Sequence, residues 1–146
     1  MPLEIVETNL QEKYLGNGAT NGNKNYTLED HLENVPASIR GIFERLRKRI
    51  LNLDASVKEE VKKQYIAYKN TTNFVDIELQ KKRLKITLNL PFDEINDLKS
   101  LCKDITGIGH FGNGDVEISL SSFESIDDVM ALVHQSFEKH WEDSDA

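Results

Sequence analysis

Cysteine is nearly absent from this sequence of 146 residues, which limits the disulfides and metal sites that it can form. The one cysteine, Cys102, cannot form a disulfide within the chain, and no Cys/His cluster offers the ligands of a structural zinc site. No run approaches the ~20 apolar residues of a membrane-spanning helix. The first residues lack the basic start and apolar core of a secretory signal. We therefore expect a cytoplasmic protein with no membrane association, no metal and no cofactor.

The composition that remains fits one folded domain. Hydrophobic residues make up 38% of the chain and charged residues 29%, which suits a single core. Residues 1–26 are expected to form a flexible leader, because the run from Gly16 to Asn25 has no apolar anchor. Residues 142–146 are expected to form an acidic frayed tail. The single α+β domain is therefore expected over residues 27–141.

Charge is unevenly spread along the chain. Residues 1–35 hold 2 basic and 6 acidic side chains, residues 36–90 hold 13 and 6, and residues 91–146 hold 3 and 13. Such asymmetry indicates either a basic surface for an anionic partner or segments that neutralise each other within one fold.

Two helices are expected first. Thr27 and Asp30 have the spacing of a capping box, and Pro36 suits the first turn of a second helix that runs to about Asn52. One face of that helix carries an apolar stripe with the 3.6-residue period. The stripe consists of Ile39, Ile42, Phe43, Leu46, Ile50 and Leu53.

Strands with alternating apolar and polar residues follow. They are predicted at Lys62–Lys69, Phe74–Leu79, Leu84–Leu90 and Val116–Leu120. A helix is predicted from about Asp93 to Ile105, with Cys102 inert on its apolar stripe, and a last helix is capped by Ser122. The order α-α-β-β-β-α-β-α predicts one mainly antiparallel four-stranded sheet packed against helices.

A glycine-rich segment, residues 107–115, separates the predicted third helix from the last strand. It matches G-x-G-x-x-G, but a dinucleotide fingerprint follows a strand and opens a helix, so Gly107 is interpreted as a helix C-cap. The segment is either a structural turn or a loop that contacts a ligand or partner. In the second case His110 and Asp115 could form an acid–base pair. The candidate loop site comprises Gly109, His110, Phe111, Asn113 and Asp115.

Basic residues cluster in the middle of the chain. They could form a phosphate-facing surface, with Tyr65 and Tyr68 stacking on bases, or they could merely solvate a helix and two turns. The candidate contacts are Arg40, Arg45, Arg47, Lys48, Arg49, Lys81, Lys82 and Arg83. Three further residues, Asp76, Glu78 and Gln80, share a strand face and resemble a variant of a nuclease E-x-K element. We interpret them as a solvated strand face instead.

From Tyr26 to Trp141 the chain resembles an uncharacterised prokaryotic domain family labelled "predicted transport protein". The likeness lies in Phe74–Leu90, Asp104–Leu120 and Ser121–His134, and DITGIGHFGNGDVEISL is its most specific part. In that family the domain often follows a restriction-endonuclease-like domain, which implies a link to DNA processing or defence. The resemblance supplies no catalytic residues.

These observations favour a non-enzymatic accessory or binding module of a prokaryotic nucleic-acid system, with nucleic acid or a nuclease as partner. Two alternatives stay open. One is a small-ligand-binding protein or enzyme that uses the loop 107–115, and the other is a protein–protein interaction module. The sequence does not fix the oligomeric state.

Overall fold

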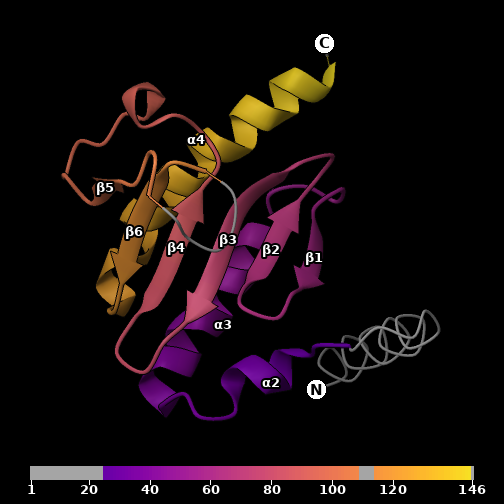
Figure 1. The fold of residues 1–146 in the computed structure, drawn as a ribbon, viewed down its shortest axis with the longest axis vertical. Coiled ribbons are helices and arrows are strands. Elements are labelled where there is room, and N and C mark those ends of the chain that lie inside the picture. The colour runs from indigo at the N-terminus through magenta and orange to yellow at the C-terminus, as the bar shows by residue number, and fades with distance from the viewer. Residues whose placement is uncertain (1–24, 109–113, 146) are drawn as a thin grey trace.

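A six-stranded antiparallel sheet dominates the computed structural model, which describes residues 25–108 and 114–145 (Figure 1). Its strand order is β1-β2-β3-β4-β6-β5. The strands are β1 Lys58–Val61, β2 Ile66–Lys69, β3 Asn73–Leu79, β4 Leu84–Leu88, β5 Cys102–Asp104 and β6 Val116–Leu120. The helices are α2 Leu28–Leu32, α3 Ala37–Leu51 and α4 Ile126–Asp145, with short 3-10 turns η2 Phe92–Glu94 and η3 Phe123–Ser125.

The core lies between the sheet and the two long helices, α3 and α4, which cover one face (Figure 1). Cross-strand pairs such as Ile77 with Ile86 put apolar side chains on that face, and both are fully buried. The stripe of α3 packs against them, with Phe43 and Leu46 fully buried. The α+β class predicted from the sequence is confirmed.

The predicted helix starts are also confirmed in their main features. The Asp30 amide donates to the Thr27 hydroxyl at 3.1 Å, and the Thr27 amide donates to the Asp30 carboxylate at 2.8 Å, so the capping box is complete. Pro36 precedes α3 as its N-cap and makes no side-chain capping bond. Its missing amide costs nothing there, because the first amides of a helix lack partners within it.

The prediction of four strands was wrong, because the sheet has six. The segment predicted as one strand, Lys62–Lys69, turns where the Lys62 amide donates to the Tyr65 carbonyl at 2.8 Å. The hairpin places the charged segment Lys58–Val61 at the sheet edge as β1. Its sequence, KEEV, shows little of the apolar alternation from which a strand is predicted. Its charges suit an edge strand, because they discourage pairing with other chains.

The predicted helix from Asp93 to Ile105 was wrong as well. Only η2 is helical there, and the chain then runs irregularly into β5. The Asp97 carboxylate accepts from the backbone amides of Leu101 and Cys102 at 2.9 and 2.7 Å. Ser100 has φ 56 and Leu98 is 88% exposed. Side-chain to backbone bonding of this kind competes with helix formation.

Two further details differ from the predictions. Gly107 lies in a turn after β5, with φ 78, and does not end a helix. Ser122 precedes η3 without a side-chain capping bond, and α4 begins at Ile126. That helix extends to Asp145, over most of the segment expected to be an acidic tail. The expected leader, residues 1–26, lies almost entirely outside the described residues.

Candidate functional site

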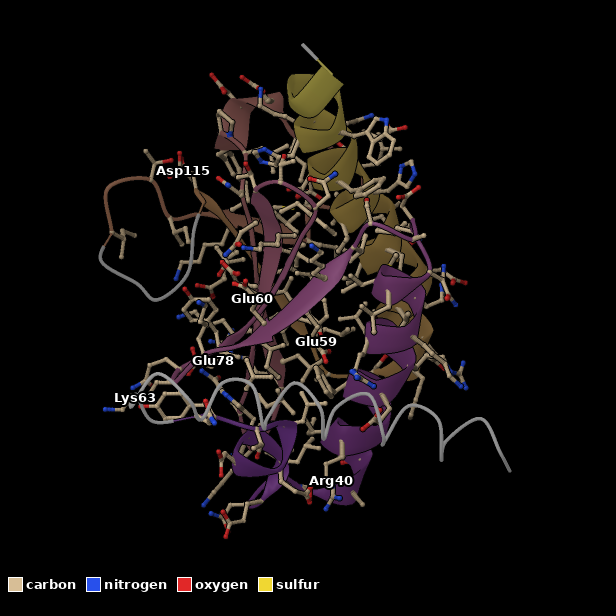
Figure 2. The ribbon with its side chains drawn as sticks, turned by 90° about the vertical axis from the view of Figure 1, so that its right-hand side faces the viewer. Arg40, Glu59, Glu60, Lys63, Glu78 and Asp115 are labelled. Atoms are coloured by element: carbon tan, nitrogen blue, oxygen red, sulfur yellow. The ribbon has the colours of Figure 1, made fainter. Side chains whose placement is uncertain are left out.

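Arg47 is held inside the fold and is therefore not a free contact residue. Its Nε and Nη2 donate to Glu59 at 2.6 and 3.0 Å, joining α3 to the edge strand β1. The side chains are 16% and 13% exposed, and Figure 2 shows Glu59 between the sheet and α3. Burial alone would lower the pKa of Arg47, but the bonds and charge of Glu59 raise it above its usual value.

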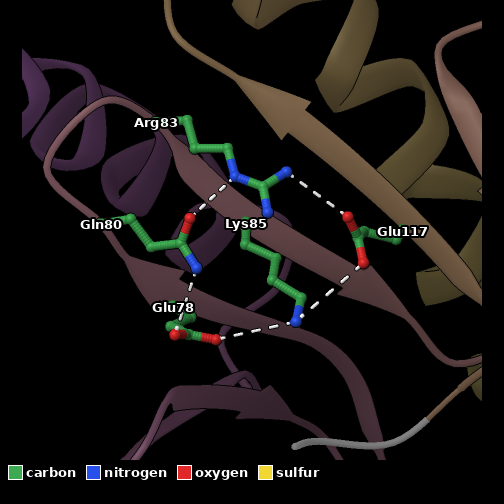
Figure 3. A network of polar contacts seen from close by, with 5 residues as sticks. All are labelled: Glu78, Gln80, Arg83, Lys85 and Glu117. Carbon is green, nitrogen blue, oxygen red and sulfur yellow. Dashed lines mark hydrogen bonds and ion pairs between the residues drawn. The ribbon is translucent and has the colours of Figure 1, made fainter. Parts of the chain in front are cut away.

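Two more of the predicted contact residues are paired with carboxylates. Arg49 donates to Asp127 at 2.6 Å. Arg83 donates to Gln80 at 2.8 Å and to Glu117 at 3.4 Å (Figure 3). Arg83 is paired with a largely buried carboxylate and Arg49 with an exposed one, so each arginine must exchange its partner to contact a phosphate.

The other five predicted contact residues form what we call the exposed cation set. All five are solvent-exposed, and the described part of the chain gives none of them a carboxylate partner. The set comprises Arg40, Arg45 and Lys48 on α3 and Lys81 and Lys82 in the β3–β4 turn. The structure thus divides the eight predicted residues into three that are neutralised and five that are available.

Phe123 is a neighbour of this set that the sequence analysis missed. The guanidinium of Arg45 lies over the Phe123 ring, 5.6 Å from its centroid, and the ring is 49% exposed. A Cβ added at Gly41 would lie 3.1 Å from the ring. A glycine inside a helical stripe costs about 1 kcal/mol relative to alanine. That glycine was the signal that another group approaches α3 closely.

The two tyrosines proposed to stack on bases differ in their exposure. Tyr68 is fully buried on the helix side, and its hydroxyl donates to Glu59 at 2.7 Å. Burial, then the nearby Glu59 charge, raises its pKa well above the usual value. Tyr65 is half-buried, and burial together with the charges of Asp76 and Glu60 raises its pKa. The stacking prediction is therefore wrong for Tyr68.

Polar residues line up across the sheet face away from the helices. Strand register places one row of six residues across all six strands: Glu60, Ala67, Asp76, Thr87, Glu117 and Lys103. Figure 2 shows Glu60 and Glu78 on this side. Asp76 and Thr87 are only 2% and 3% exposed. The interpretation of a solvated face was therefore wrong for Asp76.

A charged network holds this polar face together. The Lys85 ammonium lies 3.9 Å from Glu78 and 4.0 Å from Glu117, and Gln80 donates to Glu78 at 3.2 Å (Figure 3). Across residues 25–108 and 114–145, no three acidic, histidine or cysteine side chains are grouped to hold a metal ion. A nuclease site on Asp76, Glu78 and Gln80 finds no support in this geometry.

Most of the predicted loop site lies outside the described residues, namely Gly109, His110, Phe111 and Asn113. Asp115 is described, and its carbonyl accepts from the Ile105 amide at 2.9 Å. This bond extends the pairing of β5 with β6, so the glycine-rich segment connects two adjacent antiparallel strands.

Comparisons with known proteins give a family but no activity. A family model described as "Domain of unknown function (DUF5655)" matches residues 28–140. An "Uncharacterized protein" of Haemophilus influenzae is 40% identical over 113 residues, which cover 77% of this chain and 37% of that protein. The chain thus spans little more than a third of this relative's length. No solved structure matches. In the part of the chain that the structure describes, no helix is long and apolar enough to cross a membrane.

Proposed function

This chain belongs to the DUF5655 family of domains of unknown function, and we propose that it is a non-enzymatic module that binds nucleic acid through the exposed cation set. The observation that carries the proposal is the availability of those five side chains. Phosphate binding needs cations that are free to replace the counterions of the nucleic acid. Arg40, Arg45 and Lys48 project from one rigid helix, which fixes their spacing.

The acidic net charge of −7 is partly compensated around this surface. Two carboxylates at the start of α4 have partners of their own. Asp127 pairs with Arg49 at 2.6 Å and Asp128 pairs with Lys99 at 3.2 Å. Glu44, within α3, lies 4.0 Å from Arg47. Arg47 is already bound to Glu59, so the exposed Glu44 remains a negative charge among the cations of α3, and the exposed Glu124 follows Phe123. We expect the five cations to outweigh these two carboxylates at low salt.

A link to a nuclease partner is the second part of the proposal. It is supported by the resemblance to domains that follow restriction-endonuclease-like domains. The Haemophilus influenzae relative is much longer than the matched region, which is compatible with a multidomain arrangement. We infer that the module supplies binding to such a system and that catalysis resides elsewhere.

A binding titration tests the proposal. Labelled 20-nucleotide single strands and duplexes are titrated with the protein at low and high salt, and fluorescence anisotropy is measured. We expect binding at low salt that weakens as salt rises. The triple charge reversal R40E/R45E/K48E should abolish it. K103E, a single charge reversal on the distant strand β5, is the control for position and should retain it.

Two results would contradict the proposal. One is no binding to either oligonucleotide at low salt. The other is binding by the triple variant that equals binding by the wild type. K81E/K82E measures separately whether the β3–β4 turn contributes, because it changes only the turn residues of the exposed cation set.

The two alternative functions stay predictions. The loop-based ligand site depends on His110 and Asn113, which lie outside the described residues. An interaction module would need a contiguous apolar patch. The exposed large apolar residues of the described chain are Leu98, Ile108, Phe123 and Trp141, and they lie on four different segments.

A further inference from the structure

We propose that Phe123 and Arg45 form a stacking platform for an unpaired base, so that the module prefers single-stranded nucleic acid to duplex. This inference rests on the proposed nucleic-acid binding and adds the class of nucleic acid. Phe123 lies in η3, directly before α4, while Arg45 lies on α3. The platform therefore combines two elements that are far apart in the sequence.

The Phe123 ring packs against α3 at a glycine. A Cβ at Gly41 would lie 3.1 Å from the ring's Cζ atom, closer than an ordinary van der Waals contact. Gly41 and Arg45 are four residues apart and so lie on the same side of the helix. Gly41 leaves room for the ring, and the guanidinium of Arg45 lies over it. The two residues thus place the ring on the helix surface.

The ring keeps a large open surface in this position. Phe123 is 49% exposed, although a phenylalanine is ordinarily among the more buried residues. The Arg45 guanidinium lies 5.6 Å from the ring centroid, in reach of a cation–π interaction. Nucleobases stack on aromatic rings and on guanidinium planes with little dependence on sequence. The pair therefore offers an aromatic ring and a guanidinium group, both exposed to solvent, on which a base can stack.

Cations flank the platform where a nucleic-acid backbone would pass. Arg40 and Lys48 are exposed on α3 on either side of the Gly41–Arg45 turn. A positively charged track with an aromatic stacking residue is the usual design of proteins that bind single strands without sequence preference. Paired bases are stacked on one another inside a duplex and cannot reach a surface platform without being unpaired.

Three variants separate loss of the aromatic face from loss of the cations, Arg45 of the platform included, and from unfolding. Phe123→Leu keeps an apolar side chain against Gly41 but removes the aromatic face, and thermal melts followed by circular dichroism check its fold. Phe123→Trp keeps stacking and adds a fluorescent reporter. R40E/R45E/K48E removes the cations. Each variant is titrated with a labelled 20-mer of thymidine and with a 20-base-pair duplex at low salt.

We expect the wild type to bind the single strand more tightly than the duplex. Phe123→Leu should weaken single-strand binding about tenfold, as loss of one stacked base does, and leave duplex binding unchanged. Phe123→Trp should retain single-strand binding, and the oligonucleotide should quench its indole fluorescence more than the Trp141 fluorescence of the wild type. The triple charge reversal should weaken binding to both.

Other outcomes are distinguishable. If the triple reversal abolishes binding and Phe123→Leu binds the single strand like the wild type, the stacking platform is refuted and the proposed function survives. Tighter binding of the wild type to the duplex refutes the preference. A folded Phe123→Leu variant that loses both ligands equally shows that Phe123 only positions α4. A wild type that binds neither oligonucleotide removes the proposed function together with this inference.

Discussion

Arg47 on α3 and Glu59 on β1 form a two-bond ion pair inside the fold, with N···O distances of 2.6 and 3.0 Å. Tyr68 on β2 donates to the same carboxylate at 2.7 Å. One carboxylate thus holds together a helix and two strands at one edge of the sheet. Because β1 has only four residues and a charged sequence, this contact does more for its placement than its own apolar area does.

Removing one partner of that pair should destabilise the protein. We expect Arg47→Met to lower the free energy of unfolding by about 2–3 kcal/mol, because it leaves Glu59 buried without its cation. Urea denaturation followed by circular dichroism measures the loss. The double variant R47M/E59L should lose less than the two single variants together. Strict additivity, or a loss within 0.5 kcal/mol for Arg47→Met, would contradict the structural role.

Substitution by alanine should destabilise the protein to very different extents at two glycines with positive φ. Gly114 has φ +120, and an added Cβ would lie 2.1 Å from the Leu88 carbonyl oxygen. Gly107 has φ +78, and an added Cβ would meet nothing within 4 Å. We expect Gly107→Ala to cost about 1 kcal/mol of conformational strain. Gly114→Ala should cost about 3 kcal/mol or more, because the backbone of β4 must also move.

Urea denaturation of the two glycine variants provides the comparison, with each serving as the control for the other. Equal losses of stability in Gly107→Ala and Gly114→Ala would show that the close approach of Gly114 to β4 is absent. The predicted order depends on the neighbouring backbone and not on the glycine content of the segment.

The sequence predicted the elements whose apolar residues repeat regularly. Helix α3 follows the 3.6-residue period, and β3, β4 and β6 follow strict alternation. The edge strands β1 and β5 were not predicted, because they are short and charged. The region after η2 looked helical because its apolar spacing fits a helix. The hydrogen bonds from Leu101 and Cys102 to the Asp97 side chain, which prevent a helix there, have no periodic signature.

The candidate contact residues were predicted only as a set. The sequence shows that they are basic, but their partners are distant along the chain. Arg47 meets Glu59 across 12 positions, Arg83 meets Glu117 across 34 and Arg49 meets Asp127 across 78. Such pairings depend on strand register and helix packing, so no local pattern could separate the neutralised arginines from the exposed ones.

Leu98 provides a direct test of the irregular segment after η2. A helix over Asp93–Ile105 would bury it, whereas the structure leaves it 88% exposed. We expect Leu98→Asp to change the free energy of unfolding by less than about 0.5 kcal/mol, as surface substitutions do. Leu101 packs against the core, so Leu101→Asp is the matched control and should cost several times more. Substantial unfolding of Leu98→Asp would favour the helix after all.

Asp97 should make stability depend on pH. Burial raises its pKa, but the amides of Leu101, Cys102 and Ser100 outweigh that effect and bring it below the usual value. The stabilisation is therefore complete above the unfolded pKa of about 3.9 and is lost as pH falls through the folded pKa. We expect Asp97→Ala to cost about 1–2 kcal/mol at pH 7, with the difference from wild type shrinking below about pH 4. Urea denaturation across pH 2–7 measures this, and a difference that grows with acid would contradict it.

Cys102 should react slowly with thiol reagents while the protein is folded. Burial, together with the charge and hydrogen bonding of Asp97, raises the pKa of its thiol to about 12. The thiolate is the nucleophile, and a cysteine in an unfolded chain has a pKa of about 8.5. We expect reaction with a disulfide reagent at pH 8 to be about tenfold or more slower in the native state than in urea, because the smaller thiolate fraction outweighs the greater nucleophilicity of a thiolate with a higher pKa.

Neutralising the Asp97 charge should speed up this native-state reaction. Asp97→Asn removes the negative charge beside the thiol, which lowers the pKa of Cys102 and raises the thiolate fraction. Asp104→Asn is the matched control, because Asp104 is an exposed carboxylate nearby that bonds only to Thr106 in the described structure. Melts confirm that both variants remain folded at the assay temperature. If Asp104→Asn accelerates the reaction as much as Asp97→Asn, general access to the strand edge controls the rate, and the specific contact of Asp97 with Cys102 does not.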